Sequence, residues 1–415
     1  MKLASLQAAE SKLLLHTYER NPYLFVGGHD VYITDDQGND YLDLLSGIGV
    51  SALGYGHPAV QDAIQDQSRH LLHTSNLFFH ERTVELALRL TEISGLDRVF
   101  FCNSGTEAWE AALKLARANA GRLRSEGKQC GVTFLALEHS FHGRTMGSIA
   151  TTHKAKYRDP FEPVMPGVKF VRFNDIGHLR EMFSDEICAI CIEPIQGEGG
   201  INPVSQDFFA AARELCNSTG ALLIADEIQS GLGRTGEWFA YQHYGILPDV
   251  TTIAKPIANG IPMGAMLCTE SAALSFTPGM HGTTFGGGPL ACAVAIAVLD
   301  TIRRDRLLKH VADVGSYFKE QLTLLAEQHH SIVAIRGLGL MIGVELDSSE
   351  NASFVSAQMM EERVIINRTS DKVLRFLPPY ILERNHVDIA INSLDRTLAL
   401  LTQAGRPPTG EQIHG

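Results

Sequence analysis

The sequence predicts an α/β fold in which one large, mostly parallel sheet is followed by a smaller α+β domain. Short apolar runs such as "RVFFCN" (98–103), "ALLIADE" (221–227) and "DVTTIAK" (249–255) alternate with longer segments of helical periodicity. Runs this apolar are typical of strands that are buried on both faces of a sheet. A long helical pattern over 289–329 and a strand–turn–strand pattern over 332–346 then mark a change of character.

The chain is long enough for more than one hydrophobic core, since 45% of its 415 residues are hydrophobic. We expect three parts. An N-terminal segment over 1–60 joins the small domain, a large ligand-binding domain spans 61–300, and a C-terminal small domain spans 301–415. No internal repeat or low-complexity linker interrupts this order.

The composition argues against several classes of protein. The formal net charge is −12 and no basic run is present, so we expect no nucleic-acid partner. No apolar run reaches the roughly 18 residues of a membrane-spanning helix. The first residues lack the apolar core of a signal peptide, and the seven cysteines are scattered. Cys188 and Cys191 have CxxC spacing but fall in an apolar run, which predicts buried, reduced thiols and a cytoplasmic location.

Lys255 is the one charged residue in the apolar and small-residue stretch 251–268. It follows a predicted strand and precedes Pro256. A lysine in this position has two explanations. Its head group reaches solvent along an apolar stem, or its amine is kept neutral for nucleophilic chemistry.

Acidic side chains also follow predicted strands. Asp226 ends the run "LLIAD", at the carboxyl edge where α/β sheets bind ligands, and a buried carboxylate there needs a cationic partner. Glu193 and Glu198 surround a glycine-rich turn after another strand. The GxGxxG spacing in 231–236 is not a dinucleotide fingerprint, because four residues separate it from the strand and no good helix follows.

Two further strand ends carry polar groups. The segment "NSGTEAWEAALKLAR" (103–117) predicts a helix with Ser104 as N-cap and Glu107 completing a capping box, and such a helix N-terminus is also an anion site. After the strand at 132–139 come Phe141, His142 and Arg144. His139 and His142 lack a third ligand at suitable spacing, so we expect no metal.

Together these groups match the needs of pyridoxal 5′-phosphate. Its aldehyde bonds to a lysine, its ring nitrogen needs a carboxylate, its phosphate needs backbone N–H groups, and its ring needs an apolar face. Lys255, Asp226, the helix that begins after Ser104, and Phe141 supply one of each. The combination is more specific than any of its members.

The chain resembles the class-III aminotransferases, and among them most closely the acetylornithine aminotransferases. The resemblance extends from about residue 18 to 380. It rests on "NSGTEA", "FHGRTMGS", "EPIQGEGG", "ADEIQSGLGRTG", "IAK", "TFGGGPLA" and "LRFLPP", which occur in the order of the family. It implies a fold-type-I, aspartate aminotransferase-like pyridoxal-phosphate transferase.

The resemblance implies two sets of functional residues. The first set binds the cofactor and consists of Ser104, Gly105, Thr106, Phe141, His142, Asp226, Gln229 and Lys255, with the partner subunit's Thr284 completing the phosphate site of a homodimer. The second set binds the substrate and consists of Tyr18, Arg144, Glu198 and Arg375. Lys255, Asp226 and Glu198 are catalytic on this reading.

Within the first set, the resemblance implies that Lys255 bonds to the cofactor aldehyde and then moves a proton at the substrate carbon. Asp226 pairs with the ring nitrogen, and Gln229 approaches the ring hydroxyl. Phe141 stacks on the ring. Gly105 and Thr106 hold the phosphate.

Within the second set, Arg144 and Arg375 each receive a substrate carboxylate, and Tyr18 lines the entrance. Glu198 neutralises Arg375 while an ω-amine is bound and moves away when glutamate enters. We expect Gly197 and Gly199, on either side of Glu198, to permit that movement.

The implied reaction transfers the ω-amino group of N2-acetyl-L-ornithine to 2-oxoglutarate, which gives N-acetyl-L-glutamate 5-semialdehyde and L-glutamate in arginine biosynthesis. Succinylornithine, N-succinyl-diaminopimelate, ornithine and 4-aminobutyrate remain alternative donors. A same-fold aminomutase or decarboxylase, or a binding protein without activity, remains a further alternative. Three departures from the family pattern are Trp109, the absence of an asparagine before Pro289, and the stretch 254–262.

Overall fold

A computed structural model describes residues 2–403, and its large sheet has seven strands in the order β4-β12-β11-β10-β7-β5-β6. Strand β12 is antiparallel to both neighbours, and the other pairs run parallel. The strands are β4 (Arg98–Cys102), β5 (Thr133–Leu137), β6 (Val168–Val171), β7 (Ile187–Ile192), β10 (Leu222–Asp226), β11 (Val250–Ile253) and β12 (Gly264–Cys268). The expected α/β class is confirmed.

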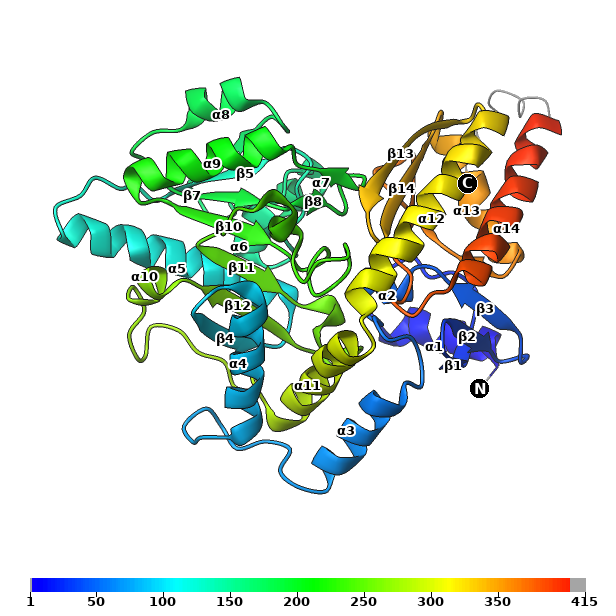
Figure 1. Cartoon of the computed structure of the whole chain (residues 1–415), viewed down its shortest axis with the longest axis horizontal. Helices are drawn as coiled ribbons and strands as arrows, with labels where there is room; N and C mark the ends of the chain where they lie inside the picture. Colours follow the sequence, from blue (N-terminus) through cyan, green and yellow to red (C-terminus); the bar gives the residue numbers. More distant parts are fainter. Residues whose placement is uncertain (1, 404–415) are drawn as a thin grey trace.

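The central strands are buried on both faces because helices cover the sheet from two sides. Helix α5 (Gly105–Ser125) packs on one face, where Trp109 belongs to the cluster that also holds Cys188 and Cys191. Helices α8 (Ile176–Met182) and α9 (Gln206–Thr219) cover β6, β7 and β10. Figure 1 shows them on the side of the sheet opposite α5. The two cysteines of the CxxC pair are fully buried free thiols, as the apolar run predicted.

Two smaller sheets lie apart from the large one, at the right of Figure 1. The first has the order β1-β2-β3-β15 and the second β13-β14-β17-β16. Their strands are β1 (Phe25–His29), β2 (Tyr32–Asp35), β3 (Asp40–Asp43), β13 (Ile332–Leu338), β14 (Met341–Leu346), β15 (Val364–Ile365), β16 (Asn367–Thr369) and β17 (Val373–Phe376). Because β15 pairs in parallel with β3, residues from both ends of the chain share one sheet. The boundaries at 60 and 300 stay predictions.

The remaining elements connect these sheets or pack around them. They are α1 (Leu3–Leu13), α2 (Ser46–Gly49), α3 (Pro58–Ser68), α4 (Glu81–Ser94), α6 (Met146–Ala150), α7 (Ala155–Arg158), η1 (Asp159–Phe161), β8 (Ile195–Gln196), β9 (Asn202–Pro203), η2 (Ala240–Tyr244), η3 (Lys255–Ala258), α10 (Glu270–Ala273), α11 (Pro289–Arg304), α12 (Leu307–Gln328), α13 (Ser349–Glu361) and α14 (Arg384–Gln403).

The single helical pattern expected over 289–329 is two helices, α11 and α12. The break falls at Arg306, whose φ of 53° lies in the left-handed region that a continuous helix cannot contain. No glycine or proline marks this position. The turn is therefore imposed by how the two helices pack, which a periodicity argument does not capture.

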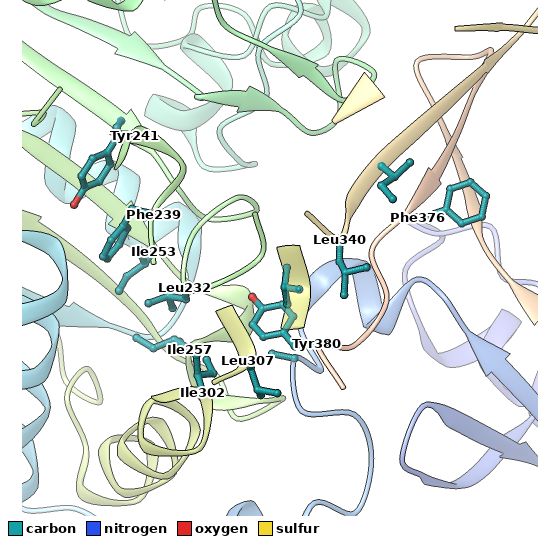
Figure 2. Packing of buried hydrophobic residues seen from close by; sticks show 14 of the residues in the cluster. Leu232, Phe239, Tyr241, Ile253, Ile257, Ile302, Leu307, Leu340, Phe376 and Tyr380 are labelled. Atoms are coloured by element: carbon teal, nitrogen blue, oxygen red, sulfur yellow. The ribbon is translucent and has the colours of Figure 1, made fainter. Parts of the chain in front are cut away.

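One continuous hydrophobic core joins the large sheet to the C-terminal strands. It includes Ile253 of β11, Leu307 at the start of α12 and Phe376 of β17, all of them buried. Figure 2 shows Tyr380 packed between these groups. A core that crosses the junction keeps the edge of the large sheet at a set distance from Arg375, because close-packed interiors deform little.

Candidate active site

A cavity of about 310 Å³ opens at the carboxyl edge of the large sheet. It gathers residues that follow five different strands of that sheet, as expected for ligand sites in open α/β folds. Of the predicted residues it is lined by Ser104, Gly105, Thr106, Phe141, His142, Glu198, Asp226, Gln229 and Lys255. The structure thus brings together nine side chains or backbone positions that are up to 151 residues apart in the chain.

Lys255 lies two residues after the end of strand β11 and has a φ of 32°, a left-handed conformation that is uncommon for a residue with a side chain. Such backbone conformations persist only where the surrounding structure holds them, and they cluster at functional sites. Burial lowers the pKa of the Lys255 amine, and the Arg375 cation lowers it further against the opposing effect of Glu198 and Asp226. The net lowering favours the neutral, nucleophilic form.

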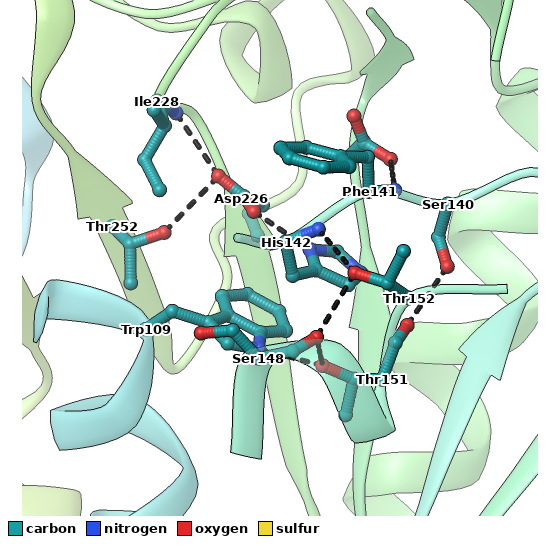
Figure 3. A network of polar contacts seen from close by, with 12 residues as sticks. Trp109, Ser140, Phe141, His142, Ser148, Thr151, Thr152, Asp226, Ile228 and Thr252 are labelled. Carbon is teal, nitrogen blue, oxygen red and sulfur yellow. Dashed lines mark hydrogen bonds and ion pairs between the residues drawn. The ribbon is translucent and has the colours of Figure 1, made fainter. Parts of the chain in front are cut away.

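Asp226, the last residue of β10, is held by three hydrogen bonds. Its Oδ2 lies 2.7 Å from Nδ1 of His142, and its Oδ1 accepts bonds from the Ile228 N–H at 3.1 Å and the Thr252 hydroxyl at 3.3 Å (Figure 3). Only 4% of the side chain is exposed. The carboxylate therefore has one orientation, with its partner His142 on one side and the cavity beside it.

The N-terminus of α5 opens into the same cavity. Ser104 caps the helix by accepting a hydrogen bond from the Glu107 N–H at 3.3 Å. The expected capping box is not reciprocal, because the Glu107 carboxylate accepts the N–H of Asn103 rather than that of Ser104. At Gly105 a Cβ atom would come within 2.9 Å of the Ile228 side chain, so any other residue would require Ile228 to shift. The first N–H groups of a helix have no partner within it and attract anions.

Phe141 and Glu193 form one unit at the end of β5 and β7. The Phe141 N–H donates to the Glu193 carboxylate at 3.0 Å, and the Gly197 N–H donates to its other oxygen at 3.2 Å. Burial raises the pKa of Glu193 well above its usual value, and Asp226 adds to this. The aromatic ring lines the cavity from a backbone that Glu193 holds in place.

Glu198 is paired with Arg375 of β17. The Arg375 guanidinium donates to the Glu198 carboxylate, to Asn367 Oδ1 at 3.0 Å and to Gln229 Oε1 at 3.3 Å. Burial acts to raise the pKa of Glu198, but Arg375 and Lys255 outweigh it, and the net pKa is lowered. Arg375 is almost fully buried, whereas about a third of the Glu198 side chain is exposed (1% and 32%).

Four predicted residues do not line this cavity, and of these only Arg375 bonds residues that do, Glu198 and Gln229. The Arg144 guanidinium lies 3.8 Å from the centre of the Tyr157 ring and 5.5 Å from that of Phe141, with its side chain exposed. Tyr18 is 75% exposed, in a segment without regular structure, and contacts Arg20. Thr284 lines a separate, small pocket together with residues 73–76, Phe78 and His80.

The sequence analysis missed several residues that complete the site. Asn103, Ile228 and Met263 line the cavity, and Thr252 bonds Asp226. Thr252 had a recognisable signal, because it is a polar residue within an apolar strand and lies opposite Asp226 in the sheet. Ile228 carried none, since its contact with Gly105 depends on a turn that follows β10.

These residues fit pyridoxal phosphate. A lysine with a lowered pKa, a buried carboxylate of fixed orientation, an aromatic ring and a helix N-terminus that begins with Gly105 all border one cavity. Among residues 2–403, no group of histidine, cysteine, aspartate or glutamate side chains is suited to hold a metal ion. In the same described part, no helix is both long and apolar enough to cross a membrane.

Comparison with known proteins places this site in a family. A family model described as aminotransferase class-III matches residues 16–398. The acetylornithine aminotransferase of Methanocaldococcus jannaschii is 46% identical over 93% of this chain and 96% of its own length. That of Aquifex aeolicus is 45% identical over 93% of this chain and 99% of its own length.

Solved structures agree with these relatives. An ornithine aminotransferase from Toxoplasma gondii superposes with a TM-score of 0.92 at 30% identity, covering 97% of this chain and 96% of that chain. A second structure of that enzyme, also at 0.92 and 30%, has partial occupancy of pyridoxal phosphate at its active site and covers 97% of this chain and 95% of that chain. The cofactor of this chain is accordingly pyridoxal 5′-phosphate. The chain belongs to the class-III aminotransferases and is an enzyme of that family.

Proposed function

We propose that this enzyme transfers the ω-amino group of N2-acetyl-L-ornithine to 2-oxoglutarate, giving N-acetyl-L-glutamate 5-semialdehyde and L-glutamate in arginine biosynthesis. The choice of donor is supported by the names of relatives that are 43–46% identical over at least 93% of the chain. The solved structures similar to this chain include an ornithine aminotransferase and an amine transaminase, so the fold alone does not select the donor.

The observation that carries the proposal is the Glu198–Arg375 pair beside Lys255. Acetylornithine and glutamate react at the same lysine through different amines, an ω-amine and an α-amine. Only glutamate carries a carboxylate on the reacting carbon. A buried arginine that is neutralised by a partly exposed glutamate can accept that carboxylate when it is present and stay paired when it is not.

Each side chain of the site has a proposed task. When bound, pyridoxal phosphate withdraws electrons from the carbon that loses its proton. Asp226, fixed by His142 and Thr252, keeps a negative charge at the place of the ring nitrogen. Burial makes the Lys255 amine easier to deprotonate. The neutral amine takes the proton from the substrate carbon, and the ammonium so formed gives it back later in the same half-reaction.

A second cavity of about 610 Å³ supports a donor that carries a carboxylate. It shares Phe141 and Glu198 with the first cavity. The cationic residues among its lining are Lys154, Lys156, Arg158 and Arg368. Arg144 stacks on Tyr157, which also lines it. We propose that donors enter through this cavity with their carboxylate toward these cations, as the role expected for Arg144 requires.

The donor is tested by single-turnover kinetics of the first half-reaction. Acetylornithine, succinylornithine, N-succinyl-diaminopimelate, ornithine and 4-aminobutyrate are each mixed with the cofactor-loaded enzyme, and the cofactor absorbance is followed. We expect the highest kcat/KM for acetylornithine, and the lowest for 4-aminobutyrate, whose one carboxylate sits close to the amine. A preference for ornithine or for a succinyl donor would replace the donor and keep the enzyme class. A substrate that is isomerised without amino transfer to 2-oxoglutarate would favour an aminomutase.

We further propose a homodimer in which each subunit completes the other's phosphate site. The surface around Thr284 supports this, because it is strongly apolar and exposed. Its exposed apolar side chains are Leu72, Leu77, Phe78, Phe79 and Phe285, with Phe79 fully exposed. Asn76 bonds the carbonyls of Thr283 and Gly286, so the two segments form one surface. Exposed apolar patches of this kind mark protein–protein contacts.

The dimer is tested by Phe79→Glu, which places a charge in this surface. We expect a monomer whose affinity for pyridoxal phosphate falls by about tenfold or more, the equivalent of one lost contact of about 1.4 kcal/mol. Sedimentation gives the oligomeric state and absorbance titration the affinity. Val333→Glu, which charges an exposed apolar residue of β13 (61%) away from this surface, should leave both unchanged. A Phe79→Glu monomer that retains full cofactor affinity would contradict the shared site.

Two other expectations enter the proposal without further support from the site. The domain division at residues 60 and 300 stays as expected from the sequence, and Tyr18 stays the proposed entrance residue. A cytoplasmic location is supported by the seven cysteines, which are free and buried, as in proteins of reducing compartments.

A further inference from the structure

Trp109 belongs to helix α5, whose first residues line the candidate active site. Its side chain is fully buried. The indole ring stacks on the imidazole of His142 with 3.9 Å between ring centres and 4° between planes. Its Nε1–H donates to the Thr151 hydroxyl at 2.9 Å, which fixes the plane of the indole (Figure 3). The largest side chain of the helix is thus held parallel to the ring that bonds Asp226.

His142 depends on that stack for its orientation. Its Nδ1 lies 2.7 Å from Asp226 Oδ2, and its backbone N–H donates to the Thr152 hydroxyl at 3.0 Å. Its other ring nitrogen, Nε2, is buried and has no hydrogen-bond partner within the described part of the chain. The orientation of the ring therefore rests on two contacts, the Nδ1–Asp226 hydrogen bond and the flat stack on Trp109.

The missing partner at Nε2 also selects a tautomer. A buried N–H without an acceptor is costly, and it is more costly on a charged ring than on a neutral one. The arrangement that avoids this has the proton on Nδ1, donated to Asp226, and a bare Nε2.

We propose that Trp109 is a positioning residue for the cofactor: by stacking on His142, whose Nε2 is buried, it keeps Nδ1 of the imidazole directed at Asp226. The inference rests on the proposed role of Asp226 as the partner of the ring nitrogen. Loss of the stack would free the ring to turn, or let an N–H at Nε2 find an acceptor, and either change would remove the proton that Nδ1 donates to Asp226. The carboxylate would then bind the ring nitrogen less strongly.

The test compares Trp109→Phe, which keeps an aromatic face, with Trp109→Leu, which keeps only apolar bulk. An aromatic stack changes an equilibrium constant by up to about tenfold. We expect Trp109→Leu to bind pyridoxal phosphate about tenfold more weakly, as measured by absorbance titration of the apoenzyme, and Trp109→Phe to stay within about twofold of the wild type. The other tryptophan supplies the control, since Trp238→Phe should leave the affinity unchanged.

A second measurement reads the proton position on His142 in the wild-type enzyme and does not depend on cofactor binding. Nitrogen-15 NMR of histidine-labelled wild-type enzyme, with the His142 signal assigned by its loss in His142→Asn, should show a protonated Nδ1 and an unprotonated Nε2. A protonated Nε2 in the wild type, or equal affinities of Trp109→Leu and Trp109→Phe, would overturn the proposal. Asp226→Asn distinguishes a failure of the proposed role of Asp226 from a failure of the role of Trp109. If it leaves cofactor affinity intact, the proposed role of Asp226 fails, whereas a loss in Asp226→Asn without a loss in Trp109→Leu removes only the role of Trp109.

Discussion

Replacement of Lys255 by alanine is expected to abolish transamination while the protein still binds its cofactor. The side chain supplies both the amine that bonds to the cofactor and the base that moves the substrate proton, and a positioned acid–base group alone contributes about 10²–10⁴-fold to a rate. Asp226, Phe141 and the N-terminus of α5 are untouched by the change and retain their contacts. We therefore expect turnover to fall by more than about 10⁴-fold.

Two measurements check this result. Absorbance spectra should show loss of the covalently bound cofactor, and equilibrium dialysis should show that the cofactor still associates. Lys309→Ala removes an exposed lysine of α12 and serves as the control, for which spectrum and turnover should not change. A Lys255→Ala spectrum identical to that of the wild type would show that another amine carries the cofactor.

Glu198→Ala is expected to separate the two half-reactions. In the wild type Glu198 neutralises Arg375, which is 1% exposed and has only uncharged partners, Asn367 and Gln229, besides it. Breaking a buried pair leaves one charge without compensation, at a cost of roughly 3–5 kcal/mol. Because a third of Glu198 is exposed, water offsets part of that cost, so we expect the reaction with acetylornithine to weaken by about 10- to 100-fold. Glutamate brings its own carboxylate to Arg375, and its reaction should be retained or improved.

The comparison is single-turnover kcat/KM for each donor in wild type and variant. Glu345 offers a matched control, because it pairs with Arg336 at 2.6 Å and is 32% exposed, like Glu198, but lies outside the cavity. Glu345→Ala should affect neither donor selectively. Equal losses with both donors in Glu198→Ala would mean that Glu198 supports the structure and does not switch between substrates.

The glycines beside Glu198 act differently from the sequence-based expectation. We expected Gly197 and Gly199 to permit movement, yet neither has a positive φ. A Cβ at Gly197 would come within 2.2 Å of Gln229, and one at Gly199 within 2.7 Å of the His139 carbonyl. They are small because neighbouring groups approach closely. The movement expected of Glu198 would therefore be a rotation of its side chain, which is partly exposed.

The helix break at Arg306 and the positions of Tyr18, Arg144 and Thr284 could not be derived from local patterns. Tyr18 lies in a segment without regular structure, so no periodicity places it. Arg144 has a flexible side chain and precedes α6. Its contact is with Tyr157 of α7, which the turn after α6 brings back toward it. Thr284 lies outside the cavity of its own chain, and its expected role requires a second subunit.

The sequence by itself determined which strands are buried and which groups stand at their ends. Lys255, Asp226 and the start of α5 lie at the end of an apolar strand or within three residues of it, and the carboxyl ends of parallel strands meet at one edge of a sheet whatever the loops between them do. The tertiary structure alone decided the stack of Trp109 on His142. It also forms the pair of Glu198 and Arg375, which the family resemblance implied but no local pattern did, since the partners of the two contacts are 33 and 177 residues apart and belong to different elements. Such contacts depend on the orientation of whole elements across a packed core, and a local pattern of apolar and polar residues carries no information about that orientation.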